Sequence, residues 1–405
     1  MAAQAFIIVG AGLAGAKAAE ALRGSGFDGP ISLIGAEEHL PYERPPLSKE
    51  YLAGKADRDT VFVHDMTWYR QQGIDLRLGS PVTAIDRAAR QVRLADGARL
   101  PFGKLLLTTG ARPRQLAGAT GVHYLRTLDD SDRLKEILAN GSRLAVIGGG
   151  WIGLEIAAAA RQAGLQVTVV ESLELPLLRV LGREMGQVFA DLHRSQGVDL
   201  RLGVRIDEVI STGSTATGVR LADGTRIGAD AVVAGIGATP STELAEQAGL
   251  ETGDGIVTSA ALRTSDPDIF AAGDIANAFH PLLGHHVRVE HWANALKQPA
   301  VAAAAMLDED TRYEELPYFY TDQYDLGMEY VGHVGSGYDQ IVVRGDLEAG
   351  EFIAFWLKDG RVLAGMNVNI WDVTDSIKNL IRSGHPVNAD ALGDPGTSLE
   401  DLAAG

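Results

Sequence analysis

The most informative absence in this chain of 405 residues is cysteine, of which it has none. Without cysteine the chain cannot form disulfides, bind a metal through thiolates or supply the usual ligands of an iron–sulfur cluster. It also cannot run a redox cycle through a dithiol or a sulfenate. This absence excludes every redox mechanism that depends on a protein thiol.

Long apolar runs and basic residues are also scarce. The apolar stretch 144–163 is interrupted by Glu155 and Arg161, so it predicts a strand and a helix and not a membrane span. No basic and apolar leader precedes the first predicted strand, and we expect a cytoplasmic protein without a membrane partner. The 36 Lys and Arg residues against 53 Asp and Glu give a net charge of −17, which argues against nucleic acid as a partner.

What the chain does have is a glycine-rich turn close to its N-terminus. The β-branched run Phe6–Val9 predicts a buried strand, and the Ala-rich segment 16–22 predicts a helix. The residues between them follow the G-x-G-x-x-G spacing and are Gly10, Gly12, Leu13, Ala14 and Gly15. The three glycines suit a tight turn, the approach of a pyrophosphate and the packing of helix on strand, and the helix N-terminus attracts phosphate. The stretch therefore predicts a dinucleotide site.

The whole pattern then occurs a second time. A predicted strand at 144–147 leads into a second glycine-rich turn that contains Gly148, Gly150, Ile152 and Gly153. Both copies continue with an acidic strand end, an Asp-Gly hairpin in an identical six-residue stretch (92–97 and 219–224), and Gly-Ala-x-Pro at 110–113 and 237–240. Because four features recur in one order, the sequence predicts two dinucleotides, one for each copy.

The acidic residue after the second strand of each copy indicates how the ribose is held. In the second copy Glu171 ends the strand, and no arginine follows until Arg179, so we expect NADH in preference to NADPH. In the first copy the strand Ile31–Ile34 is followed by Gly35 and Ala36, and we assign the ribose to Glu37, with a solvated surface charge as the plainer alternative for the next residue, Glu38.

Two further segments carry predictions. The prolines in Arg44-Pro45-Pro46-Leu47-Ser48-Lys49 favour a rigid arm that presents Arg44 and Lys49 to an anionic cofactor, or else a surface loop, with Ser48 capping a following helix. Towards the C-terminus, Phe319–Val334 and Glu351–Met366 predict strands and 371–382 a helix, with Tyr324 and Trp371 in the core. The predicted fold class is α/β, with two Rossmann-like dinucleotide-binding domains and a C-terminal α+β domain.

The motifs VGAGLAG, RPPLSK, TTGARP, GGGWIGLE, AAGD and FYTDQYD, in this order, resemble the FAD-dependent, NADH-linked ferredoxin reductases of the putidaredoxin-reductase type. The resemblance covers essentially the full chain. It implies a discontinuous FAD domain at 1–112 and 242–318, an NAD domain at 113–241 and a C-terminal domain at 319–405. It also implies a hydride transfer from NADH to FAD, followed by single-electron transfer to a [2Fe-2S] ferredoxin that feeds a cytochrome P450 or an aromatic-ring dioxygenase.

The same resemblance carries roles over to individual residues. In the family the ribose acid often falls at the position of Ala36, so Glu37 is its substitute here. Asp274 would bind the ribityl chain, Trp292 would lie by the pyrimidine end of the flavin, and Val82 and Arg126 would line the FAD. The FAD set is Gly10, Gly12, Leu13, Ala14, Gly15, Ala36, Glu37, Arg44, Lys49, Val82, Thr109, Gly110, Arg126, Asp274 and Trp292. The NAD set is Gly148, Gly150, Ile152, Gly153, Glu155, Glu171 and Gly237.

Hydride transfer depends mainly on positioning, so we expect no nucleophile or proton-abstracting dyad. The catalytic candidates are Lys49 and Glu155, which the resemblance brings together beside the flavin, where Glu155 would bind the nicotinamide amide. The plainer alternative for Glu155 is a first-turn acid that complements its helix dipole. The histidines 285, 286 and 291 lack the spacing of a zinc site, and no metal is expected.

The missing cysteine excludes some alternative functions and leaves others open. Disulfide reductases, thiol peroxidases and water-forming NADH oxidases of this superfamily need a cysteine and are excluded. A simple flavin NADH oxidase and a NAD-sensing flavoprotein like the mitochondrial apoptosis-linked proteins remain as alternatives. The sequence does not identify the ferredoxin, its docking surface or the terminal oxygenase, and it does not decide between monomer and dimer.

Overall fold

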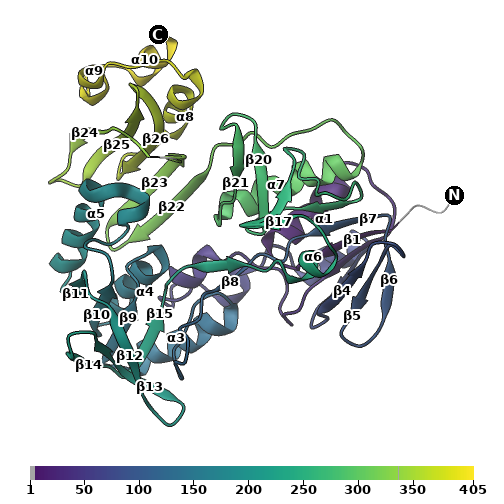
Figure 1. Ribbon diagram of the computed structural model, residues 1–405, viewed down its shortest axis with the longest axis horizontal. Coiled ribbons are helices and arrows are strands. Elements are labelled where there is room, and N and C mark those ends of the chain that lie inside the picture. The colour runs from purple at the N-terminus through teal and green to yellow at the C-terminus, as the bar shows by residue number, and fades with distance from the viewer. Residues whose placement is uncertain (1–4, 336) are drawn as a thin grey trace.

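The computed structural model describes residues 5–335 and 337–405, and it contains three sheet-centred units (Figure 1). Two units are built on parallel sheets, and the third, at the C-terminal end of the chain, is built on an antiparallel sheet. This arrangement confirms the predicted fold class, two Rossmann-like units and an α+β unit.

The first unit has a five-stranded parallel sheet whose strand order reverses beside β1. Its strands, in sheet order, are β19 (Ile269–Ala271), β7 (Lys104–Leu107), β1 (Phe6–Val9), β2 (Ile31–Ile34) and β3 (Ile74–Arg77). One face packs on α1 (Leu13–Gly24) and α7 (Trp292–Met306), through a core that includes Leu22, Phe270 and Met306. All four residues of β1 are buried, as expected for a strand that is covered on both faces.

The other face of this sheet packs on a small antiparallel sheet of β4 (Val82–Asp86), β5 (Gln91–Leu94) and β6 (Arg99–Pro101). The other elements in the segments 45–71 and 243–287 are β17 (Thr252–Gly253), β18 (Gly255–Thr258), β20 (Ala276–His280), β21 (His285–Val287), α2 (Met66–Gln71), α6 (Glu243–Gln247) and the 3₁₀ turns η1 (Pro45–Ser48) and η2 (Arg58–Val61). Because β19 and α7 come from the chain after residue 260, this unit is discontinuous in sequence.

The second unit repeats the plan of the first. Its parallel sheet is β11 (Asp199–Leu202), β10 (Gln166–Glu171), β9 (Arg143–Ile147) and β15 (Ala231–Ala234). Helices α3 (Leu128–Asn140) and α4 (Trp151–Gln162) cover one face, and a small sheet of β12 (Ile206–Thr212), β13 (Thr215–Leu221) and β14 (Arg226–Gly228) covers the other. Helix α5 (Leu178–Ser195) completes the unit.

The repeated sequence motifs form the same local structures. In both hairpins the aspartate side chain accepts a hydrogen bond from the backbone two residues later, at 2.8 Å for Asp96 and 2.9 Å for Asp223. The two Gly-Ala-x-Pro segments become β8 (Ala111–Pro113) and β16 (Ala238–Pro240), which pair antiparallel with each other. They form the two-stranded connection between the first and second units (Figure 1).

The C-terminal unit differs in detail from its prediction. Its sheet order is β22 (Tyr318–Gln323), β23 (Leu326–Gly332), β26 (Arg361–Val368), β25 (Glu351–Lys358) and β24 (Gln340–Asp346), followed by α8 (Thr374–Ser383), α9 (Ala389–Gly393) and α10 (Leu399–Ala404). The predicted long strand at 319–334 is two strands, because Tyr324 adopts a left-handed φ of 57° in a tight turn. Strand β24 was not predicted at all.

Trp371 is a second correction, because it is 54% exposed and lies outside the core. It sits in the irregular segment between β26 and α8, where its ring lies against Gly327. Tyr324, also expected in the core, is half-buried and packs edge-on against His193 of α5, with ring centroids 5.3 Å apart. Helix α8 begins at Thr374, three residues after the predicted start.

The second unit and the C-terminal sheet share one hydrophobic core. Side chains of α4 and α5 pack directly on the sheet, and this core includes Leu181, Phe189, Met328 and Trp356. The indole of Trp356 also donates a hydrogen bond of 3.1 Å to the carbonyl of Leu181. The C-terminal sheet therefore contacts the second unit through buried apolar side chains and through a buried hydrogen bond.

Within residues 5–335 and 337–405, none of the helices is long and apolar enough to cross a membrane.

Candidate dinucleotide and active site

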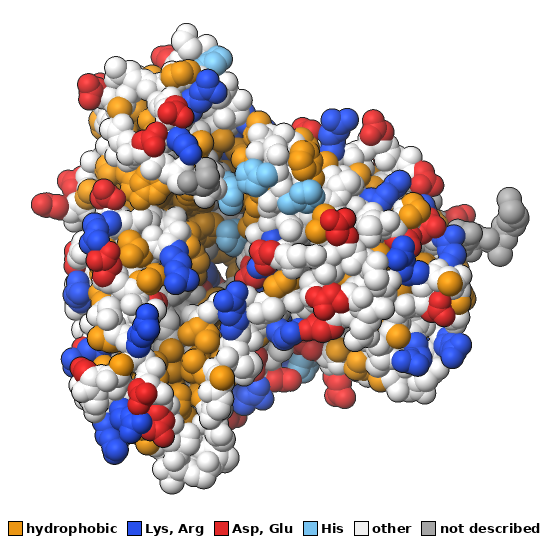
Figure 2. All heavy atoms as spheres, in the orientation of Figure 1, with side chains coloured by type: hydrophobic (Ala, Val, Ile, Leu, Met, Phe, Trp, Pro, Cys, Tyr) orange, Lys and Arg blue, Asp and Glu red, His pale blue; other side chains and the backbone are white. Residues whose placement is uncertain are grey.

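The two glycine-rich turns open into one cavity at the centre of the molecule. Its volume is about 670 Å³, within the range of roughly 300–1,000 Å³ that is typical of ligand sites. Gly10 and Gly12 line it from the first unit, Gly150 and Ile152 from the second, and Tyr320 from the C-terminal unit. In the space-filling view, the surface is hollowed between the three units, and apolar side chains lie in the hollow (Figure 2).

The first turn has the geometry that a dinucleotide needs. Gly10 has a φ of +115°, and a Cβ there would lie 2.2 Å from the carbonyl oxygen of Thr108, so only glycine fits. At Gly12 a Cβ would meet no protein atom within 4 Å, because this position faces the cavity. At Gly15 a Cβ would lie 2.1 Å from the carbonyl oxygen of Gly10, so this glycine serves the packing of α1 on β1.

The glycines of the second turn have the same separate roles as those of the first. Gly148 has a φ of +100°, and a Cβ at Gly153 would lie 2.1 Å from the carbonyl oxygen of Gly148. These two residues, like Gly15, lie behind the cavity wall and not on it. Gly150, the N-cap of α4, faces the cavity instead.

The N-termini of α1 and α4 face the cavity, and neither has a side-chain cap; the uncapped N-terminus of α7, which begins at Trp292, also lines it. In the described part of the chain, four other helices are capped by side chains, among them α2 by Asp65 and α3 by Thr127, whereas α5, α6, α7 and α8 are not. An uncapped helix start leaves backbone N–H groups and the positive end of the dipole available to an anion. Each glycine-rich turn therefore fits a phosphate or pyrophosphate group.

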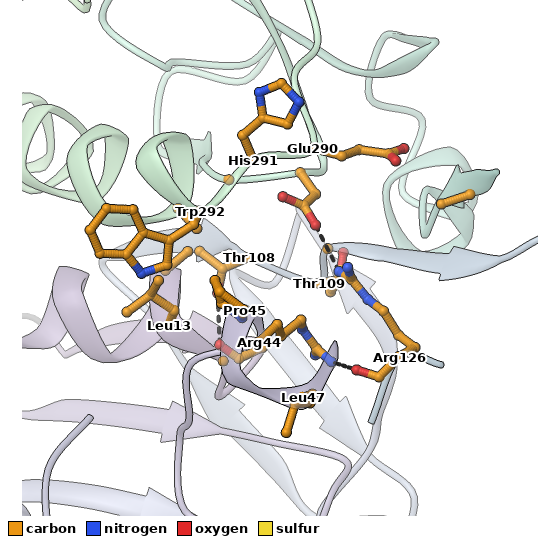
Figure 3. Close-up of a pocket in the computed structure, with 18 of the residues that line it drawn as sticks. Leu13, Arg44, Pro45, Leu47, Thr108, Thr109, Arg126, Glu290, His291 and Trp292 are labelled. Atoms are coloured by element: carbon orange, nitrogen blue, oxygen red, sulfur yellow. Dashed lines mark hydrogen bonds and ion pairs between the residues drawn. The ribbon is translucent and has the colours of Figure 1, made fainter. Parts of the chain in front are cut away.

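A cluster of charged groups lies around the first turn (Figure 3). Arg44 donates to the carbonyl oxygen of Arg126, and Arg126 pairs with Asp274 at 2.7 Å. Burial lowers the pKa of the Arg126 guanidinium, and its Nε atom is buried without a protein partner. Since a buried N–H group without a partner is costly, the site fits an additional acceptor such as a cofactor phosphate or hydroxyl.

Glu37 lies on the cavity wall with its carboxylate held by neighbours. The hydroxyl of Tyr42 donates to it at 2.6 Å, and Arg44 lies 3.6 Å away. Burial raises the pKa of Tyr42 to about 12, so this hydroxyl stays a donor. Trp292 also lines the cavity, and its indole donates to Glu43 at 3.0 Å. Ala36, Val82, Thr109 and Gly110 complete the predicted FAD set on the wall.

Lys49 and Glu155 form the ion pair that was expected. Their charged atoms are 2.5 Å apart, and the side chains are only 8% and 4% exposed. The hydroxyl of Ser48 donates to the other carboxylate oxygen at 2.5 Å, and that of Thr321 donates to the oxygen shared with Lys49 at 2.6 Å. Both Lys49 and Glu155 line the cavity.

The predicted residues therefore divide into two groups. The structure brings together on one cavity wall all but four of them, the exceptions being Gly15, Gly148, Gly153 and Glu171. Glu171 lies beside the second turn, where it accepts hydrogen bonds from the backbone of Gly149 at 2.7 Å and Leu173 at 2.8 Å. Gly237 and Ile152 line the cavity, and Trp151 packs on Phe319 with ring centroids 4.9 Å apart.

Sequence reasoning missed or misread several residues. Ser48 does not cap a helix, because its hydroxyl is engaged by Glu155 and the 3₁₀ turn η1 ends at this residue. Thr321 and Tyr320 were quoted only as part of a motif, although one contacts Glu155 and the other lines the cavity. The sequence feature that could have indicated both residues is the presence of polar residues beside aromatic ones in the predicted strand that begins at Phe319. Among the described residues, no group of three or more His, Asp or Glu side chains could hold a metal ion.

The fold and the cavity together define an oxidoreductase of the class that binds two dinucleotides. Family comparison agrees with this. Residues 4–299 match the model of the pyridine nucleotide-disulphide oxidoreductase family, and residues 318–403 match the reductase C-terminal model. The chain belongs to this family, and membership implies FAD and NAD(H) as the two dinucleotides.

Individual relatives narrow the class further. The chain is 44% identical to the ferredoxin–NAD(+) reductase component of an anthranilate 1,2-dioxygenase system of Burkholderia cepacia, over 99% of each chain. It is 41% identical to putidaredoxin reductase of Pseudomonas putida, over 98% of this chain and 96% of that one. The crystal structure of the covalent putidaredoxin reductase–putidaredoxin complex matches with a TM-score of 0.96 at 41% identity, covering 100% of this chain and 99% of that one. The predicted ferredoxin reductase family is therefore confirmed, and the chain is an enzyme.

Proposed function

We propose that this chain is an NADH-dependent ferredoxin reductase that serves an oxygenase. The observation that carries the proposal is the single cavity into which both uncapped glycine-rich turns open, with the Lys49–Glu155 pair on its wall. The relatives named for dioxygenase systems and for putidaredoxin support a [2Fe-2S] ferredoxin as the electron acceptor. The terminal enzyme would be a cytochrome P450 or an aromatic-ring dioxygenase.

Residues around the first glycine-rich turn would hold FAD. The backbone at Gly12 and Leu13 would bind the pyrophosphate, Arg44 and Arg126 would supply positive charge, and Glu37 would accept from a ribose hydroxyl. When bound, FAD accepts a hydride and releases the two electrons one at a time. The protein's own contribution is to exclude water, to fix the orientation of both dinucleotides and to place a buried ion pair beside them.

Lys49 and Glu155 have complementary tasks in this scheme. An ionised carboxylate offers about four acceptor positions, and Lys49, Ser48 and Thr321 occupy three of them. Glu155 lines the cavity, so its remaining acceptor position would accept from the amide of a nicotinamide. Lys49 lies over the ring of Tyr320 at 5.4 Å and keeps its charge available to an electron-rich cofactor.

We also propose NADH as the preferred reductant. The carboxylate of Glu171 is fixed by the backbone of Gly149, within the second glycine-rich turn. A carboxylate there accepts from a free ribose 2′-hydroxyl and repels a 2′-phosphate. The domain limits stay as proposed from the sequence, with an FAD domain at 1–112 and 242–318, an NAD domain at 113–241 and a C-terminal domain at 319–405.

The test separates this function from its two alternatives. Purified protein is reconstituted with FAD and given NADH and cytochrome c, with and without an added [2Fe-2S] ferredoxin. A ferredoxin reductase shows cytochrome c reduction that depends on the ferredoxin. An NADH oxidase shows peroxide formation that no ferredoxin changes, and a NAD-sensing flavoprotein shows slow reduction and a long-lived charge-transfer band.

A further inference from the structure

A series of buried polar side chains leads from helix α5 to the Lys49–Glu155 pair. His193, Gln323, Thr321 and Glu155 have relative exposures of 0%, 1%, 1% and 5%. Polar groups at this depth are costly unless they are hydrogen-bonded. Two of the four residues lie on β22 of the C-terminal sheet, one on α5 and one on α4, so the series crosses the interface between two units.

Each member is hydrogen-bonded to the next. His193 Nε2 lies 2.8 Å from Gln323 Oε1, and Gln323 Nε2 donates to Thr321 Oγ1 at 3.2 Å. The Thr321 hydroxyl then donates to Glu155 Oε1 at 2.6 Å. At the outer end, the hydroxyl of Tyr324 lies 3.3 Å from His193 Nδ1.

With the Glu155 carboxylate ionised, the protons of this series are placed in only one direction. Since the oxygen of Gln323 accepts, His193 must carry its proton on Nε2, which leaves Nδ1 to accept from Tyr324. Since the hydroxyl oxygen of Thr321 accepts from Gln323, its single proton points to Glu155. Burial lowers the pKa of His193, which keeps the ring neutral as this arrangement requires.

We propose that His193, Gln323 and Thr321 are positioning residues that fix the Glu155 carboxylate, in its ionised form, beside Lys49. This inference rests on the proposed function, because it concerns the same site. Hydrogen bonds that run in one direction polarise one another, and here they end on the charged acceptor. The carboxylate therefore keeps one orientation and one vacant acceptor position for a nicotinamide amide.

Other charged groups near the carboxylate are few. Lys49 forms an ion pair with it. Asp322 and Tyr320 lie on β22 and interact with it electrostatically without a hydrogen bond, and Glu50 interacts electrostatically with both Asp322 and Tyr320. Burial raises the pKa of Tyr320 to about 12, so this group stays neutral over the working range. Burial also raises the pKa of Asp322. Because Asp322 lies near Glu155 but is outside the hydrogen-bonded series, Asp322→Asn is the control for the effect of a nearby charge.

The main test compares Thr321→Val, which keeps the shape but removes the hydroxyl donor, with Thr321→Ser, which restores it. The rate of FAD reduction by NADH is measured against pH in the FAD-loaded enzyme, and the midpoint potential of the flavin is measured against pH by dithionite titration. Because Thr321 donates to the charged carboxylate, removing this donor should move the acid limb of both profiles up by about one pH unit in Thr321→Val.

The size of the shift in the pH profiles should depend on which hydrogen bond of the series each variant removes. Thr321→Ser should keep the wild-type profiles, and Gln323→Met should shift them in the same direction as Thr321→Val but less, because Thr321 still donates. Asp322→Asn should not shift the acid limb upward. If Thr321→Val and Thr321→Ser have the same pH profiles and differ from wild type only in thermal stability, the residues are structural and the inference is wrong.

A measurement on the unmodified protein covers the case in which a variant fails to fold. In the ¹⁵N-histidine spectrum of the FAD-loaded protein at neutral pH, His193 should be neutral with its proton on Nε2. A proton on Nδ1 or a charged ring would overturn the inference. The potential titration and this spectrum use neither NADH nor ferredoxin, so they remain informative even if the proposed function itself fails.

Discussion

Replacing Glu155 by glutamine removes one charge and changes the shape of the site very little. The variant leaves the Lys49 ammonium, which is only 8% exposed, without its anionic partner. It also turns one of two acceptor oxygens into a donor, although Ser48, Lys49 and Thr321 all need acceptors at this carboxylate. Breaking one side of a buried ion pair typically costs about 3–5 kcal/mol of stability, so a marked drop in Tm is expected.

The effect on the reaction follows from the acceptor position that binds the nicotinamide amide. A hydrogen bond to a charged group contributes about 1.5–3 kcal/mol, which corresponds to a roughly 10- to 150-fold slower reduction of FAD by NADH. The assay is anaerobic stopped-flow bleaching of the flavin with excess NADH, after the FAD content of each protein has been determined.

The control is Asp322→Asn, which removes a carboxylate that has no direct bond to Lys49 in the structure. This variant should bleach at close to the wild-type rate. The reasoning is refuted if Glu155→Gln binds FAD normally and bleaches as fast as the wild type does. A loss of FAD from Glu155→Gln would instead assign the residue to cofactor retention.

Three further predictions concern other parts of the chain. Gly12→Ala should fold with a near-native Tm but retain little FAD, because its Cβ enters the cavity, whereas Gly10→Ala should lose the fold itself, as judged by circular dichroism. Glu171→Gln should reduce the ratio of kcat/KM for NADH over NADPH, and an unchanged ratio would remove Glu171 from the specificity site. Burial lowers the pKa of His193 below its usual 6.5 and that of His291 to about 4, so between pH 6.5 and pH 4 the unfolded chain binds more protons than the folded chain. The free energy of unfolding should therefore fall as the pH drops from 6.5 to 4. The variant His193→Gln should weaken this pH dependence.

The sequence predicted the parallel units well because their signals are local. The run Phe6–Val9, the glycine spacing and the Ala-rich helix are all contained in about twenty residues, and the repeat of the pattern confirmed each part of it. A Cβ at Gly10 or Gly15 would clash with backbone, so these residues have no alternative and the motif is easy to recognise. The buried strands of such sheets are also continuous apolar runs.

The C-terminal unit was harder to predict, since its strands depend on partners far away in the chain. The turn that divides β22 from β23 uses Tyr324 in a left-handed conformation, which residue preferences do not indicate. Trp371 is apolar and large, yet it lies in a loop on the surface. Whether an aromatic side chain is buried depends on how the strands pack, and no short stretch of sequence contains that information.

For the site, the sequence predicted candidate residues but not what holds them in place. Lys49 and Glu155 were paired in advance only through the family resemblance, and the structure confirms the contact. Ser48 and Thr321, which also donate hydrogen bonds to Glu155, come from segments 107 and 166 residues away from it. Such a network is a property of the folded chain, because it forms only where three units meet.

The proposed function requires that electrons leave the flavin for a ferredoxin and not for oxygen. The most direct test is to reduce the FAD-loaded protein with one equivalent of NADH under anaerobic conditions. The reduced protein is then mixed in the stopped flow either with an oxidised [2Fe-2S] ferredoxin or with air-saturated buffer. We expect the ferredoxin to reoxidise the flavin much faster than oxygen does, in two one-electron steps. Reoxidation that is faster with oxygen, and unaffected by ferredoxins of several types, would contradict it.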